Sequence, residues 1–288
     1  MTAGERRATA GLRESFYERL DKAKFASNSS TAGPWGPQMQ HAGPPSALLT
    51  MQMMNDHPRE GFHPARVTFE LLGQIPVAEL TAETSVLYST KRTDLLSGTL
   101  LCGDKPVAMA RMWRYRSAPE SLASVRKLGI RHRPLPFEDS VAPVEPLVLA
   151  YDDSVTPPVP LDMTNHTAGY MSAVEWRFAS EKPFGRYGPG QVWARPRIPL
   201  VLDETDSPFG RLMTMADSCW SMGRRVEMPK HVAINTEITV HCHRLPEGDW
   251  LRLDGSTVTT PGGAGVSHST MSDREDECAY VLQSMFIA

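Results

Sequence analysis

The sequence predicts an α+β protein made of two similar halves, in which a long helix is followed by several antiparallel strands. Two segments carry this prediction, RVTFELLGQIP at 66–76 and TEITVHCHRLP at 236–246. Each has the alternating pattern of a strand that ends in a proline turn, and each is followed by two or more further strands. Each half also opens with an apolar segment of helical spacing. The shared order of elements indicates an internal repeat.

The two halves superpose when Pro76 is placed on Pro246, which gives an offset of 170 residues (246 − 76). The same offset keeps the last strands in step without a gap, PVAMARMWRY in the first half and ECAYVLQSMF in the second. Constant spacing over several elements supports a repeat better than residue identity does. We therefore expect an N-terminal half at 1–116 and a C-terminal half at 169–288.

Residues 117–168 separate the halves and are expected to form a crossing linker. This segment contains eight prolines, and proline lacks the N–H that the interior of a sheet requires. Apolar stretches within it, such as EPLVLAY, indicate that it packs along the surface.

The first helix is predicted near 44–56. Pro44 and Pro45 suit the first turn of a helix, because the N–H that proline lacks would have no partner there. His41 and Gly43 stand immediately before it, where a helix directs bare N–H groups and a partial positive charge outward.

The second helix is predicted near 208–224. Ser207 provides an N-cap, and Pro208 follows at the first helical position. Asp217 lies beside the apolar stripe of this helix, where a carboxylate is costly unless it is hydrogen-bonded. The alternative is a partly exposed residue paired with Arg224 or Arg225.

Composition excludes several classes of protein. The 288 residues are 41% hydrophobic and 22% charged, with a net charge of −3. These values are ordinary for a globular protein and give no sign of nucleic-acid binding. No segment resembles a signal peptide or a membrane span. The four cysteines form no CxxC pair and read as reduced thiols, so a cytoplasmic protein is expected.

Motifs of several enzyme classes are absent. The sequence contains no GxSxG, GxGxxG or GxxxxGK[ST] motif, which argues against a serine-elbow hydrolase, a dinucleotide enzyme and a P-loop protein. His241 and His243 lie on one face of a strand, but spacing places no third ligand beside them. We expect neither a metal ion nor a cofactor.

Three segments resemble the acyl-CoA thioesterase II family, and most closely its thioesterase-like branch. They are GPW…HAGPPSALL, INTEITVHCHR and YVLQSMFIA. The resemblance implies the double hotdog fold, in which each repeat wraps an antiparallel sheet around a long central helix. It also implies hydrolysis of an acyl-CoA substrate, and pairing of two copies of the chain through their sheets.

The same resemblance implies that three side chains hold the attacking water. They are an aspartate on the second helix, a Thr or Ser on the next strand and a glutamine on the last strand, which correspond here to Asp217, Asn235 and Gln283. Gln283 also stands out by pattern, because it is the one polar residue on its strand face. The other residues on that face are Ala279, Val281, Met285 and Ile287.

Asn235 departs from the family pattern, since an amide replaces the hydroxyl. Alternation places Asn235 on a polar face with Glu237 and Thr239, whereas Thr236 falls on the apolar face. A bulge would exchange their roles. We assign the strand position to Asn235 and keep Thr236 as the alternative, in contact with substrate.

His41 and Gly43 are assigned to substrate binding, since a backbone N–H at this helix start could polarise the thioester carbonyl. A simple turn is the alternative reading. The offset of 170 predicts one active site per chain, in the second half, because it pairs the three polar positions with groups that cannot activate water. These groups are Ala47, Ala65 and Trp113.

Two other functions fit the predicted fold. One is a non-catalytic module that binds acyl thioesters, which the amide at Asn235 leaves open. The other is a hotdog hydratase or dehydratase, although the His-containing loop of those enzymes is not found in the sequence.

Overall fold

The computed structural model describes residues 13–117, 169–178, 190–222 and 232–288. The predicted linker at 117–168 therefore lies outside the described residues, apart from its first residue. Arg224 and Arg225 lie outside them as well. No helix in the described ranges is long and apolar enough to cross a membrane.

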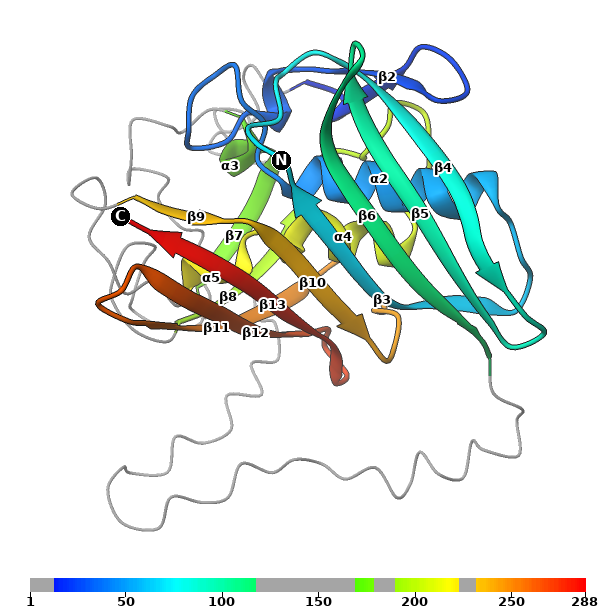
Figure 1. Ribbon diagram of the computed structural model, residues 1–288. Helices are drawn as coiled ribbons and strands as arrows, with labels where there is room; N and C mark the ends of the chain where they lie inside the picture. The colour runs from blue at the N-terminus through cyan, green and yellow to red at the C-terminus, as the bar shows by residue number, and fades with distance from the viewer. Residues whose placement is uncertain (1–12, 118–168, 179–189, 223–231) are drawn as a thin grey trace, which may run out of the picture.

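Within these ranges, thirteen strands form one sheet in which neighbouring strands are antiparallel (Figure 1). The first half contributes β1 (Tyr17–Arg19), β2 (Lys24–Ser27), β3 (Phe62–Leu71), β4 (Glu79–Ser89), β5 (Thr93–Cys102) and β6 (Lys105–Arg116). The second half contributes β7 (Val174–Phe178), β8 (Gly190–Pro196), β9 (Ala233–Asn235), β10 (Glu237–Cys242), β11 (Leu251–Thr259), β12 (Ala264–Ser272) and β13 (Glu277–Ile287). The spatial order is β1-β2-β4-β5-β6-β3-β10-β13-β12-β11-β8-β7, with β9 paired to β13.

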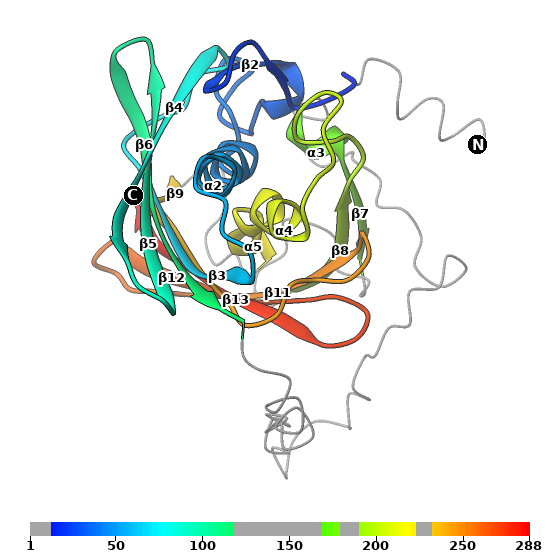
Figure 2. The ribbon, with the colours of Figure 1, turned by 90° about the vertical axis from the view of Figure 1, so that its right-hand side faces the viewer.

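The sheet curves around the helices, which lie on its concave side (Figure 2). The helices are η1 (Ser29–Thr31), α2 (Gly43–Asp56), α3 (Tyr170–Ala173), α4 (Pro208–Ala216) and α5 (Cys219–Met222). The two halves contact each other where β3 pairs with β10, where α2 packs on α4, and where α3 packs on η1. The backbone of Tyr17 also bonds to that of Leu200 and Leu202. A large antiparallel sheet with few helices confirms the predicted α+β class.

Strand pairing repeats along the chain at an offset of 171 residues, not 170. Pro64 pairs with Arg114 in the first half, and Asn235 pairs with Met285, each 171 residues further on, in the second. The same offset relates the other strand pairs. It also relates two irregularities in register, one after Leu100 in β5 and one after Met271 in β12.

The predicted offset of 170 was wrong because it rested on two prolines in turns. A turn tolerates a difference of one residue, whereas a shift of one in a strand exchanges its two faces. The residues equivalent to Asp217, Asn235 and Gln283 are therefore not Ala47, Ala65 and Trp113. At 171 they are Ser46, Pro64 and Met112.

Helix α2 begins as predicted, with Pro44 and Pro45 in its first turn. Helix packing also requires a glycine at position 43. A Cβ atom at Gly43 would lie 2.1 Å from the carbonyl oxygen of Thr214. The close crossing of α2 and α4 therefore excludes a side chain at this position.

The second helix is not the continuous segment predicted at 208–224. Ser207 caps α4 as expected, since its Oγ accepts from the N–H of Gly210 at 2.9 Å. The helix ends at Ala216, and the short α5 begins at Cys219.

Two hydroxyl groups from other elements contact the last turn of α4 before this interruption. The carbonyl of Met213 accepts from Ser46 Oγ at 3.2 Å, and that of Thr214 accepts from Tyr170 Oη at 2.9 Å. Both carbonyls belong to the end of a helix, where side chains of other elements can serve as donors.

Candidate active site

Asp217 is the centre of the candidate site and lies in the break between α4 and α5. The residue is buried, with 4% of its surface exposed. Its Oδ1 atom accepts from Asn235 Nδ2 at 2.8 Å and from Gln283 Nε2 at 3.2 Å. Its Oδ2 atom accepts from the backbone N–H of Ala42 at 3.1 Å. Both halves of the chain thus supply the N–H groups that allow this carboxylate to be buried.

Asn235 reaches Asp217 because the strand is interrupted directly after it. Strand β9 ends at Asn235 and β10 begins at Glu237, so Thr236 is the extra residue between them. The equivalent place in the first half is the register shift of β3 between Pro64 and Arg66. The irregularity turns Asn235 inward, so the polar, solvated face predicted for it from simple alternation was wrong.

Thr236 does not join the cluster around Asp217. Its side chain is exposed, and its backbone bonds to Ser284 and Leu71 on the neighbouring strands. Of the two candidates for this strand position, the structure brings Asn235 to the carboxylate.

Gln283 lies on the concave face of β13, as its alternation predicts. Only 1% of its surface is exposed, and its neighbours Val281 and Met285 on the same face are also buried. Its Nε2 atom donates to Asp217, whereas its Oε1 atom is buried with no hydrogen-bond partner in the described part of the chain. Gln283 therefore presents a free acceptor beside the carboxylate.

His41 packs against Asp217 from the first half. Its ring stacks on Tyr170 with centroids 3.7 Å apart and an interplanar angle of 7°. Burial lowers the pKa of His41, and the nearby carboxylate of Asp217 opposes this shift. Since the ordinary value is 6.5, the imidazole is neutral at pH 7.

The Nδ1 atom of His41 has two contacts that are mutually exclusive in a neutral ring. It lies 3.1 Å from Asp217 Oδ2, to which it could only donate. It also lies 3.2 Å from the backbone N of Gly43, from which it could only accept. The tautomer of His41 therefore decides whether the N–H of Gly43 is occupied or free.

Tyr170 supports the cluster and was not anticipated from the sequence. Its hydroxyl bonds Ser218 Oγ at 2.8 Å as well as the carbonyl of Thr214. Burial raises the pKa of this phenol well above its usual value, so the hydroxyl stays protonated. No sequence signal marks Tyr170, because it follows a proline-rich segment and acts through contacts with residues more than 40 positions away.

The two histidines of the HCH segment lie outside the cluster around Asp217. His241 is exposed on β10, and His243 Nε2 lies 2.9 Å from the carbonyl oxygen of Glu277. Among residues with described positions, no group of three or more His, Cys, Asp or Glu side chains is placed to hold a metal ion.

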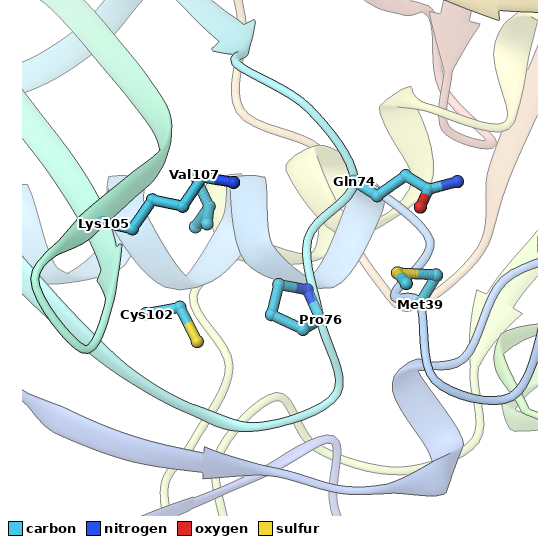
Figure 3. Close-up of a pocket in the computed structure, with 6 residues that line it drawn as sticks. All are labelled: Met39, Gln74, Pro76, Cys102, Lys105 and Val107. Carbon is cyan, nitrogen blue, oxygen red and sulfur yellow. The ribbon is translucent and has the colours of Figure 1, made fainter.

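A pocket of about 350 Å³ opens between the turns that follow β3 and β5 (Figure 3). Six residues line it: Met39, Gln74, Pro76, Cys102, Lys105 and Val107. It shares no residue with the cluster around Asp217, although Met39 lies two residues before His41 in the chain. The candidate site is thus defined by its buried hydrogen bonds.

Comparison with known proteins gives the class of this chain. The model of the acyl-CoA thioesterase N-terminal domain matches residues 31–115, and that of the acyl-CoA thioesterase C-terminal domain matches residues 150–287. The chain belongs to the acyl-CoA thioesterase family, a class of thioester hydrolases. None of the curated protein sequences matches it.

Solved structures share the fold at low sequence identity. A putative thioesterase from Novosphingobium aromaticivorans has a TM-score of 0.64 and 17% identity, over 94% of this chain and 98% of that one. An acyl-CoA thioesterase II, TesB2, from Mycobacterium marinum has a TM-score of 0.62 and 14% identity, over 94% of each chain. A hotdog-fold protein of unknown function from Alicyclobacillus acidocaldarius has a TM-score of 0.65 and 14% identity, over 96% and 97%.

Proposed function

We propose that this protein hydrolyses acyl-CoA thioesters to the free acid and CoA, at a single site centred on Asp217. Membership of the thioesterase family gives the class of reaction. The observation that carries the assignment of the site is the buried carboxylate of Asp217, which is held by N–H groups from both halves. No lysine or arginine of the described residues forms an ion pair with it, so its charge is not neutralised by a fixed cation.

The attacking water binds between Asp217 and Gln283 in this proposal. The water donates one hydrogen to the carboxylate and the other to the free Oε1 atom of Gln283. Asn235 donates to Asp217 Oδ1 and fixes the orientation of the carboxylate. Asp217 takes a proton as the water attacks the thioester carbon. The carbon–sulfur bond then breaks, and the proton passes from Asp217 to the departing thiolate, which leaves as CoA.

The oxyanion that develops on the thioester carbonyl is stabilised by the N–H of Gly43, at the start of α2. This N–H is free when His41 carries its proton on Nδ1 and donates to Asp217. The positive end of the α2 dipole adds to the effect. His41 thereby couples the general base to the oxyanion donor without itself becoming charged.

The two halves are, in this proposal, hotdog repeats at 1–116 and 169–288, of which only the second performs chemistry. The equivalents of the three polar residues are Ser46, Pro64 and Met112, and none of them is a carboxylate or an amide. The first half instead contributes His41, Ala42 and Gly43 to the site of the second.

The experiment that tests this function is a thiol-release assay with acyl-CoAs of short, medium and long chain. Release of free CoA at a catalytic rate supports the proposal. Tight binding of the same acyl-CoAs with no thiol release would instead favour the non-catalytic binding module. Consumption of an enoyl-CoA or a hydroxyacyl-CoA without thiol release would indicate a hydratase or dehydratase.

A further inference from the structure

A row of three polar side chains crosses the concave face of the sheet beside the candidate site. Gln283 on β13 pairs directly with Ser267 on β12, and Ser267 pairs with Thr257 on β11. All three are buried, with 1%, 1% and 4% of their surfaces exposed. The row starts at the glutamine that contacts Asp217 and extends away from it across two strands.

The first half shows what this row contains when it serves packing alone. The residues 171 positions earlier are Met112, Leu96 and Val86, and they form the same cross-strand pairs. All three are apolar; Met112 and Leu96 are completely buried, whereas Val86 is 44% exposed. The fold therefore does not require polar groups here, and their presence in the second half needs another cause.

Two atoms of the polar row are buried with no hydrogen-bond partner within the described ranges, Ser267 Oγ and Gln283 Oε1. Ser269 lies on the same face of β12, and its Oγ lies 3.4 Å from the carbonyl of Cys219. Buried polar groups are normally hydrogen-bonded, because loss of water without replacement is unfavourable. The two atoms of the row thus point to a ligand that supplies the missing bonds.

We propose that this row recognises a hydroxyl group on the acyl chain of the thioester, so that the preferred substrates are hydroxyacyl-CoAs. The inference rests on the proposed function and specifies its substrate. A hydroxyl group can donate to the second lone pair of Gln283 Oε1 and also bond Ser267 Oγ. A carbonyl substituent cannot donate, so it would leave the second lone pair of the glutamine oxygen without a partner.

Strand spacing sets the position of the recognised group on the chain. Neighbouring strands are about 4.8 Å apart, so Ser267 lies about that far from Gln283 across the sheet. In this proposal the thioester lies beside Gln283, and the acyl chain runs from there toward Ser267. An extended chain advances roughly 1.2 Å per bond, which places the hydroxyl on about the third or fourth carbon from the thioester.

The test measures binding, separately from hydrolysis, with non-hydrolysable thioethers of CoA. The S-butyl, S-(3-hydroxybutyl) and S-(4-hydroxybutyl) derivatives are titrated calorimetrically into the full chain. We expect one hydroxylated derivative to bind about 10-fold more tightly than S-butyl-CoA, in line with one well-placed hydrogen bond. Ser267→Ala should abolish this preference and leave the affinity for S-butyl-CoA unchanged.

Ser269→Ala is the matched control, because it removes a buried hydroxyl from the same strand face that already contacts Cys219. This variant should keep the preference for the hydroxylated derivative. Ser267→Ala is expected to fold with a melting temperature equal to or above that of the wild type, since it removes a hydroxyl without a protein partner.

Equal affinities of the wild type for all three thioethers would overturn the inference, and so would a preference that survives in Ser267→Ala. Neither result bears on the proposed function, which is judged by thiol release from acyl-CoAs. Conversely, absence of thiol release from every acyl-CoA would overturn the proposed function, while the thioether affinities would still decide the role of the row.

Discussion

Ser46 and Asp217 hold equivalent places in the two halves, and each contacts the backbone of the opposite half beside its helix. Ser46 Oγ lies 3.2 Å from the carbonyl oxygen of Met213, and Asp217 Oδ2 lies 3.1 Å from the N–H of Ala42. Ala42 and Met213 are themselves 171 residues apart, the offset that relates the strands. The two contacts are thus related by the same repeat, and only the second half places a carboxylate there.

Asp217→Asn is expected to lower the rate of thiol release by about 10² to 10⁴-fold, since loss of a general base typically has this effect. The amide has nearly the same shape, so the melting temperature should change far less than the rate. Ser46→Ala is the matched control in the other half and should leave the rate near that of the wild type. Turnover near the wild-type rate in a folded Asp217→Asn protein would exclude Asp217 as the base.

Asn235→Asp is expected to shift the acidic limb of the pH–rate profile upward by about one pH unit or more. The new carboxylate would face Asp217 Oδ1, and like charges at such distances raise the pKa of one of the pair. The base would then be ionised only at higher pH, and kcat/KM across a pH series reports this directly.

Asn235→Thr supplies the hydroxyl that the resemblance implies at this strand position, and a hydroxyl can also donate to Asp217. Its profile should stay close to that of the wild type. Identical pH profiles for the Asp and Thr variants would contradict a contact between residue 235 and the carboxylate proposed as the base.

Gly43→Ala should destabilise the protein by about 1–3 kcal/mol or more, because overpacking forces backbone to move. The added Cβ would lie 2.1 Å from the carbonyl oxygen of Thr214, where α2 crosses α4. Chemical denaturation measures the change. Gly262→Ala is a suitable control, since its Cβ would meet no atom closer than 3.8 Å, and a loss of equal size there would exclude the helix crossing as the cause.

His41 should make the protein less stable as the pH falls below about 6.5, the ordinary pKa of histidine. Burial lowers the pKa of His41 in the folded state, so the unfolded chain binds a proton first and is favoured at lower pH. The loss of stability due to His41 grows as the pH falls, until the pH reaches the pKa of His41 in the folded state.

The measurement compares melting temperatures between about pH 7.5 and pH 5.5 for the wild type and His41→Phe, which keeps a ring on Tyr170 but cannot be protonated. The variant should lose less stability over this range. His268→Asn changes an exposed histidine and should follow the wild type. If the melting temperature of His41→Phe falls with pH as steeply as that of the wild type, another group causes the pH dependence.

The strands and the start of α2 could be predicted from sequence because their causes are local. The strand predicted at the start of 66–76 forms the end of β3, and the face of Gln283 followed from the same period of two. Pro44 and Pro45 set the start of α2 through their own backbone geometry.

Three features could not be predicted, because their causes lie far away in the chain. At the break after Ala216, hydroxyl groups of Ser46 and Tyr170 bond the carbonyls of Met213 and Thr214, which no pattern within the helix reveals. The offset was misjudged by one residue because the marker prolines lie in turns, outside the register of the sheet.

The inward turn of Asn235 is the third feature. It depends on the extra residue Thr236, which is visible only when β9 and β10 are seen to pair separately with their neighbours. Alternation read from the sequence alone cannot locate such an irregularity.

The bond from Ala42 to Asp217 joins residues 175 positions apart, and this separation ties catalysis to the end of folding. Contacts of such long range form late, because the loop that closes them must first lose its conformational freedom. Each half could acquire its hairpins early while the carboxylate still lacks its backbone donor. During refolding, recovery of hydrolysis should therefore lag behind recovery of strand content. The rate of that recovery would measure how fast the two halves dock.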